Sequence, residues 1–113
     1  MLAILTTTVV AIMTLVGTAQ ANRSNYAVAQ RAVCHFFGGY CSQAMKIVGC
    51  ETGYTYSPWA TNGQYLGLFQ MGSWERSKYG HGNNVWAQAK AAYRYFIDSG
   101  SDWSPWLPYD HCF

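Results

Sequence analysis

Four cysteines constrain this chain of 113 residues more than any other feature. They lie at Cys34, Cys41, Cys50 and Cys112, and in an exported protein they predict two disulfides with three possible pairings. Cys41 and Cys50 flank one predicted helix, so a rise of ~1.5 Å per residue places them about 13 Å apart, too far for a bond. Cys34 and Cys50 end successive helices, and if the turn at 38–39 makes these helices antiparallel, the two cysteines lie at opposite poles. The pairing that remains is Cys34–Cys41 with Cys50–Cys112.

The first 21 residues have the pattern of a secretory signal. An apolar run from Val9 to Val16 precedes the small-x-small sequence Ala19-Gln20-Ala21, which predicts cleavage after Ala21. No Lys or Arg precedes the run, so a membrane anchor is the alternative. The threonines in and around the run lower its hydrophobicity, which makes the anchor the weaker interpretation. We therefore expect a signal peptide at 1–21 and a single domain at 22–113.

Composition narrows the class of ligand. The formal net charge is only +2, which argues against nucleic acid as a partner. The spacing of the cysteines and histidines matches no zinc pattern, so we expect no metal and no cofactor. Nine tyrosines and five tryptophans stand beside many amide and hydroxyl side chains. Most of these rings are expected to build the core, but such a composition also suits a neutral polar ligand with apolar faces, such as a sugar ring.

Hydrophobic periodicity and capping residues predict an α+β domain, mostly helical with one short β-hairpin. Helices are expected at 26–37 (capped by Asn25), at 42–51, at 73–79 (capped by Ser73) and from Val85 (capped by Asn84) to a stop at Gly100. Asn62 and Gly63 predict a tight turn between strands at 59–61 and 64–66. The expected inner faces include Val28 on the first helix and Ile97 on the last, with Trp86 packed beside the latter.

Glu51 is the candidate catalytic residue. Ala44, Ile47 and Val48 form the apolar stripe of their helix, and Glu51 continues that stripe in the last turn, before a helix stop at Gly53. Desolvation and the negative end of the helix dipole both disfavour the carboxylate. We therefore expect the pKa of Glu51 to be raised, as a general acid requires. A carboxylate that turns back to water at a frayed helix end is the alternative.

Four segments between residues 42 and 112 carry a family pattern. They are Cys50-Glu51-Thr52-Gly53, the run Asn62 to Gln70 with its Gly67-Leu68-Phe69-Gln70, an Ala-rich helix, and Trp103-Ser104-Pro105-Trp106 before a final Cys. This pattern resembles the lysozyme-like superfamily, above all the resuscitation-promoting factors and the catalytic domains of soluble lytic transglycosylases. Thr52 stands where that family usually has Ser, and the hydroxyl is kept.

The resemblance implies a small lysozyme-like fold and a peptidoglycan-cleaving enzyme. Members of the group cut the β-1,4 bond between N-acetylmuramic acid and N-acetylglucosamine, and their glutamate is the acid, a role that falls to Glu51. Cys50–Cys112 corresponds to the bridge of the resuscitation-promoting branch. The implied protein is a secreted, cell-wall-associated monomer that binds peptidoglycan glycan strands and, after signal cleavage, no membrane. A catalytically inactive wall-binding module and a small secreted factor acting by membrane or protein contact are the alternatives.

The distribution of acidic residues favours a lytic transglycosylase over a hydrolytic muramidase. No Asp or Glu occurs from Thr52 to Trp74, and Glu75 falls in the first turn of its helix, where an acid is expected to have a structural role. Asp98 and Asp102 flank a helix end and are expected to be solvated. One carboxyl is enough when the muramyl 6-hydroxyl attacks the anomeric carbon, whereas hydrolysis usually needs two.

The Asn62-Gly63 hairpin is expected to place its neighbours around Glu51. The expected cleft has Glu51 near its middle and is lined by Trp59, Asn62, Tyr65, Gly67 and Gln70. Together they offer one stacking face and several amide or hydroxyl partners to acetylated sugars, with Gly67 allowing the ligand to approach the backbone.

Overall fold

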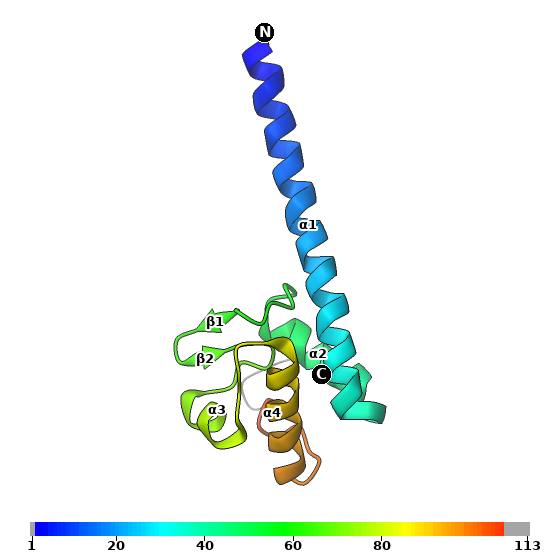
Figure 1. Cartoon of the computed structure of the whole chain (residues 1–113), viewed down its shortest axis with the longest axis vertical. Coiled ribbons are helices and arrows are strands. Elements are labelled where there is room, and N and C mark those ends of the chain that lie inside the picture. Colours follow the sequence, from blue (N-terminus) through cyan, green and yellow to red (C-terminus); the bar gives the residue numbers. More distant parts are fainter. Residues whose placement is uncertain (1, 108–113) are drawn as a thin grey trace.

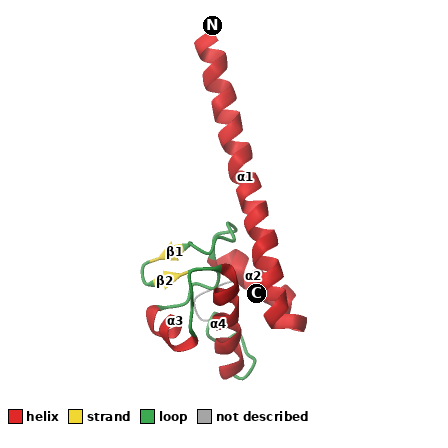
Figure 2. Cartoon of the chain, viewed as in Figure 1, coloured by secondary structure: helices red, strands yellow, loops and turns green. Residues whose placement is uncertain are grey.

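The computed structural model describes the backbone of residues 2–107 and the side chains of residues 17–107. Its elements are α1 (Leu2–Phe37), the 3-10 helix η1 (Gly38–Tyr40), α2 (Cys41–Glu51), β1 (Thr61–Asn62), β2 (Tyr65–Leu66), α3 (Ser73–Tyr79) and α4 (Val85–Asp98) (Figure 1). The fold is mostly helical with one two-stranded antiparallel hairpin, as predicted (Figure 2).

The first helix differs from the prediction because it does not begin at Asn25. One continuous helix runs from Leu2 to Phe37, and its N-terminal half projects away from the compact remainder of the protein (Figure 1). No proline interrupts this segment, so nothing in it stops a helix that has already begun. Asn25 lies inside the helix, where its side-chain amide donates to the carbonyl of Thr55 at 3.2 Å. In the part of the chain that the structure describes, no helix combines the length and apolar character needed to cross a membrane.

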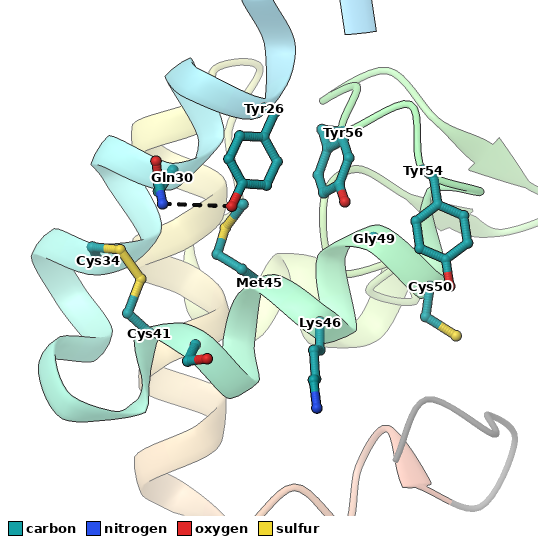
Figure 3. A pocket seen from close by; sticks show the side chains of 11 residues that line it. Tyr26, Gln30, Cys34, Cys41, Met45, Lys46, Gly49, Cys50, Tyr54 and Tyr56 are labelled. Atoms are coloured by element: carbon teal, nitrogen blue, oxygen red, sulfur yellow. Dashed lines mark hydrogen bonds between the residues drawn. A yellow bond between two sulfur atoms is a disulfide. The ribbon is translucent and has the colours of Figure 1, made fainter. Parts of the chain in front are cut away.

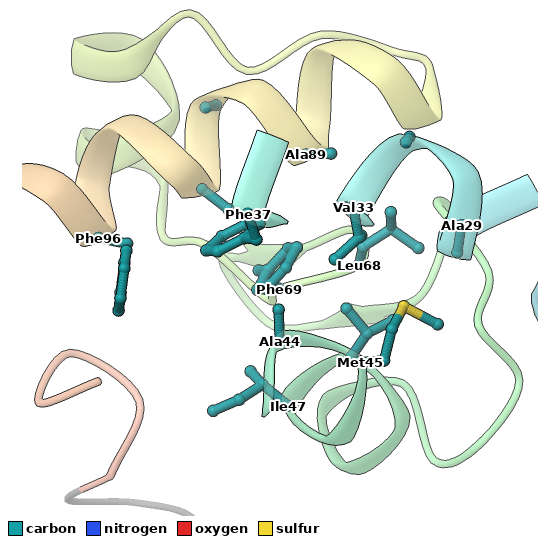
Figure 4. Packing of buried hydrophobic residues seen from close by; sticks show 14 of the residues in the cluster. Ala29, Val33, Phe37, Ala44, Met45, Ile47, Leu68, Phe69, Ala89 and Phe96 are labelled. Carbon is teal, nitrogen blue, oxygen red and sulfur yellow. The ribbon is translucent and has the colours of Figure 1, made fainter. Parts of the chain in front are cut away.

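The core lies where α1 and α4 pack together over α2 and the segment 68–71. The ring of Phe37 is its centre, with ring centroids 5.5 Å from Phe69 and 5.5 Å from Phe96 (Figure 4). Three residues expected to be buried are largely exposed: Val28 at 39 %, Ile97 at 45 % and Trp86 at 50 %. Trp86 still packs against α1, with its ring centroid 4.4 Å from that of His35 and 4.8 Å from that of Phe36.

Two predicted helix stops have the geometry of a Schellman motif. After α2, Gly53 adopts φ 60°, and the amide of Tyr54 donates to the carbonyl of Gly49 at 2.7 Å. After α4, Gly100 adopts φ 82°, and the amide of Ser101 donates to the carbonyl of Phe96 at 3.0 Å. A glycine in the left-handed region with this bond pattern ends a helix and satisfies its last carbonyls. The end of α2 is therefore held in place and not frayed.

The N-terminal ends of the last two helices differ from each other. Asn84 caps α4 as predicted, since its side-chain oxygen accepts from the amide of Ala87 at 2.8 Å. Ser73 is instead the first residue of α3, with Gly72 at the cap position and no side-chain cap bond. The Ser73 hydroxyl donates to the side chain of Gln64 at 3.2 Å, so it joins α3 to the hairpin.

The hairpin is shorter than predicted, and its turn lies one residue later. Asn62 pairs with Tyr65, which makes Gly63 and Gln64 the two turn residues, with Gly63 at φ 62°. A positive φ at the first turn residue matches the twist of paired strands. A further bridge between Leu66 and Met71 fixes this register from outside the hairpin.

One of the two predicted disulfides lies within the described residues. Cys34 and Cys41 are bonded across η1, with their Cα atoms 4.7 Å apart, which joins the end of α1 to the start of α2. Cys112 lies outside the described residues, so the Cys50–Cys112 bridge stays a prediction.

Candidate functional site

A cleft of about 570 Å³ opens beside the end of α2. Its walls come from α2, the hairpin, the segment 70–72, the first turn of α3, one residue of α4 and residues 105–106. We call it the Glu51 cleft. Among its lining residues are Glu51, Asn62, Tyr65, Gln70, Glu75 and Tyr95. Carboxyl, amide and phenol groups from five parts of the chain therefore converge on one concave surface.

Four of the six predicted site residues line this cleft. They are Glu51, Asn62, Tyr65 and Gln70, and Asn62 and Tyr65 reach it because the paired ends of β1 and β2 lie over it. Trp59 and Gly67 are not among the residues that line it, so their contact with a substrate stays a prediction. Trp59 precedes the hairpin and is 60 % exposed.

Glu51 is the last residue of α2 and is half-buried. The next residue, Thr52, is buried and holds the turn that follows. Its hydroxyl donates to the carbonyl of Val48 at 2.7 Å and accepts from the amide of Tyr56 at 2.9 Å. This hydroxyl therefore fixes the path of the chain where it leaves α2. The raised pKa of Glu51 stays a prediction.

Gln70 is held in a strained backbone conformation with its side chain fixed. Its φ is 47°, in the left-handed region that costs a non-glycine residue roughly 1 kcal/mol. Its side-chain nitrogen donates to the carbonyls of Ala60 at 2.8 Å and Gly67 at 2.9 Å. Because both partners are acceptors, the orientation of the side-chain amide is determined.

Gly67 has a structural role where a ligand contact was predicted. It is buried at φ 89°, and a Cβ atom there would lie 2.5 Å from the side-chain oxygen of Gln88 and 2.9 Å from Nε2 of His81. The side chains of Gln88 and His81 therefore occupy the space beside the Gly67 backbone that the absence of a side chain leaves open.

Gln88 on α4 holds the irregular segment that contains the hairpin by hydrogen bonds to its backbone. It is 1 % exposed, and its oxygen accepts from the amide of Leu68 at 3.0 Å. Its nitrogen donates to the carbonyls of Pro58 at 3.0 Å and Gly82 at 3.3 Å. The sequence analysis missed this residue, although Gln88 follows Val85 by three positions on the inner stripe of its helix, where a polar residue is a signal of a buried hydrogen-bonding role.

Glu75 lies in the Glu51 cleft, which the sequence did not indicate. It occupies the first turn of α3 as predicted, and its carboxylate lies over the cap residue, since a Cβ at Gly72 would be 2.6 Å from Glu75 Oε2. Burial raises the pKa of the Tyr95 phenol, and the charges of Glu75 and Tyr79 raise it further. The cleft thus contains a second carboxylate with a phenol beside it.

Trp106 is a buried aromatic residue that lines the cleft. It is 4 % exposed, and its indole nitrogen donates to the carbonyl of Phe69 at 2.9 Å. Its ring contacts Tyr95, with centroids 5.3 Å apart. Neither Trp106 nor Tyr95 was among the predicted site residues. For Tyr95 the available signal was its position seven residues after Gln88, on the same face of the helix.

His81 makes the stability of this region depend on pH. Burial lowers the pKa of His81 to about 4, and nearby Arg76 adds to the effect. In the unfolded chain a histidine has a pKa of about 6.5, so between these values the unfolded state binds more protons and stability falls as the pH falls. After allowance for solvent screening we expect a loss of about 1–2 kcal/mol between pH 7 and pH 4.

Urea denaturation of the wild type and His81→Gln at several pH values measures this loss. The stability difference between the two proteins should change across pH 6.5–4 and stay constant above pH 7. A difference that is constant over the whole range would contradict the role of His81.

Among the described residues, no three His, Cys, Asp or Glu side chains gather as they would around a metal ion. Comparison of the chain with protein-family models, with characterised proteins and with solved structures found no match.

Proposed function

We propose that the protein is a secreted, cell-wall-associated enzyme that cleaves the β-1,4 bond between N-acetylmuramic acid and N-acetylglucosamine in peptidoglycan, with Glu51 as the general acid. The observation that carries the proposal is the convergence of Glu51, Gln70, Asn62 and Tyr65 on one cleft. A carboxyl at the end of a fixed helix supplies the proton, while the amide and phenol groups suit acetylated sugars.

The proposed reaction begins with proton transfer from Glu51 to the glycosidic oxygen, while the bond from that oxygen to the anomeric carbon breaks. In the lytic transglycosylase route the muramyl 6-hydroxyl then attacks the anomeric carbon, and its proton returns to the Glu51 carboxylate. The product is a 1,6-anhydro sugar, and the acid is regenerated without a second carboxyl or a water. We propose this route as the first candidate. We also propose that the protein is a monomer and that a Cys50–Cys112 bridge holds the tail against the end of α2.

One observation favours a hydrolytic muramidase as a second candidate. Glu75 lines the same cleft as Glu51, and a second carboxylate is what an enzyme needs to activate a water or to stabilise the positive charge at the anomeric carbon. Hydrolysis adds the water oxygen to the anomeric carbon and leaves a reducing end. The two routes therefore differ in their products.

Digestion of purified peptidoglycan by the wild type and Glu75→Gln separates these routes by mass spectrometry of the soluble fragments. For the transglycosylase route we expect anhydro ends from both proteins, with activity changed less than about fivefold by Glu75→Gln. Reducing ends that fall by at least ~10²-fold in the variant would instead assign Glu75 as the second carboxyl of a muramidase. Binding of peptidoglycan without release of fragments would indicate a wall-binding module and contradict the enzyme proposal.

A further inference from the structure

A second concavity of about 660 Å³ lies on the other side of α2, between α1, α2 and residues 54–56 (Figure 3). We call it the tyrosine groove. Among its lining residues are Tyr26, Gln30, Lys46, Gly49, Tyr54 and Tyr56. None of them was singled out by the sequence.

The backbone is strained in order to place two of these tyrosines. Tyr54 has φ 65° and Tyr56 has φ 54°, and bulky residues rarely adopt the left-handed region. The conformation is held by the bond from the Tyr54 amide to the carbonyl of Gly49 and by the bond from the Tyr56 amide to the Thr52 hydroxyl. Asparagine or glycine would form this turn with less backbone strain. The strain at two nearby tyrosines is therefore better explained by a role of their side chains than by the turn itself.

Gly49 allows the two rings to lie directly on α2. A Cβ at this position would be 3.0 Å from the Tyr56 hydroxyl and 3.2 Å from Cδ1 of Tyr54. The ring of Tyr26 on α1 packs edge-on against Tyr56, with centroids 4.9 Å apart, and the Tyr26 hydroxyl accepts from the side chain of Gln30 at 3.5 Å (Figure 3). Tyr54 remains 67 % exposed. The groove therefore offers aromatic faces and hydroxyl groups to a ligand.

The charge of the groove is positive and comes from one residue. Lys46 on α2 is the only charged side chain among the described residues that line it. The Glu51 cleft, by contrast, is lined by two carboxylates and no basic residue among those described. An uncharged sugar suits the cleft, whereas the groove suits a short chain with an anionic group.

Cys50, in the last turn of α2, lines both concavities. We propose that the tyrosine groove binds the acidic stem peptide of peptidoglycan, attached to the muramyl sugar whose glycan strand occupies the Glu51 cleft. The tyrosine rings and hydroxyls contact the peptide units, and Lys46 pairs with a carboxylate. This inference rests on the proposed function, because it takes the glycan in the cleft as given.

Titration of the full chain with muramyl dipeptide and with peptide-free chitobiose, followed by NMR, tests the groove. Muramyl dipeptide should shift the signals of Tyr54 and Lys46, and chitobiose should leave them unmoved. We expect the Kd for muramyl dipeptide to rise about fivefold in Lys46→Ala and about tenfold in Tyr54→Ala, with unchanged binding of chitobiose. Lys90→Ala, which removes an exposed lysine from α4, is the matched control and should bind both ligands as the wild type does.

The failure of this inference is distinguishable from failure of the proposed function. If the wild type cleaves peptidoglycan but muramyl dipeptide shifts only residues of the Glu51 cleft, the groove is not a peptide site. If Tyr54 and Lys46 respond to the dipeptide while no glycan is cleaved, the groove binds peptide and the enzyme proposal is wrong. Equal losses of chitobiose and dipeptide binding in Lys46→Ala would also overturn the inference.

Discussion

Replacement of Glu51 by Gln is expected to reduce the release of soluble fragments from peptidoglycan by at least ~10²-fold. The amide keeps the size and much of the hydrogen bonding of the carboxyl but has no proton to transfer to the glycosidic oxygen. The Schellman motif that ends α2 is made by backbone atoms, so the helix end should be preserved. Fragment release is measured by mass spectrometry, and circular dichroism checks the fold.

Asp102→Asn is the matched control for this substitution. Asp102 lies after α4, outside the Glu51 cleft, and its side chain accepts from the amide of Ser104 at 2.6 Å, a bond that asparagine can also accept. The control should retain full activity. Cleavage by Glu51→Gln at close to the wild-type rate would remove the general acid from the proposal.

Replacement of Gln88 by Leu is expected to destabilise the fold by about 3 kcal/mol. The substitution leaves the Leu68 amide and the carbonyls of Pro58 and Gly82 without their partner, and each buried polar group left unpaired costs about 1–3 kcal/mol, in part relieved by water. For a domain of this size that corresponds to a fall in Tm of more than ~10 °C. Thermal and urea denaturation measure the change.

Gln30→Leu provides the comparison for Gln88→Leu. It makes the same chemical change on the exposed face of α1, at a residue with one long bond of 3.5 Å to Tyr26. We expect this control to lose less than about 0.5 kcal/mol. Equal stabilities of the two variants would show that Gln88 does not hold the segment that carries the hairpin and Gln70.

Features determined by local chemistry were predictable from the sequence. The stops at Gly53 and Gly100 and the cap at Asn84 depend on a few neighbouring residues, and the structure has all three. The hairpin turn was predicted one residue early, because two-residue loops at 62–63 and at 63–64 both contain the glycine that the turn needs. The bridge from Leu66 to Met71 selects between them, and no local pattern reveals it.

Features set by distant contacts were not predictable in the same way. Asn25 has the side chain of a helix cap, but a helix already under way continues through it, and the side chain bonds to residue 55 instead. Gly67 was predicted to contact a ligand. Its close neighbours in the structure, Gln88 and His81, lie far along the chain, so the sequence around Gly67 does not reveal them. The first-turn position of Glu75 was correct, whereas its place in the cleft depends on how α3 packs against the hairpin and α4.

The burial of Trp106 gives the protein an optical probe of its own candidate site. Trp59, Trp74 and Trp86 are 60 %, 64 % and 50 % exposed, so a dissolved quencher such as iodide reaches their indoles readily. Trp106, at 4 %, is shielded while its ring borders the cleft. Emission that survives the quencher therefore comes mainly from the interior tryptophans, and its wavelength reports on the polarity around Trp106. Occupancy of the cleft by a ligand is thus readable in unlabelled protein, without a chromogenic substrate.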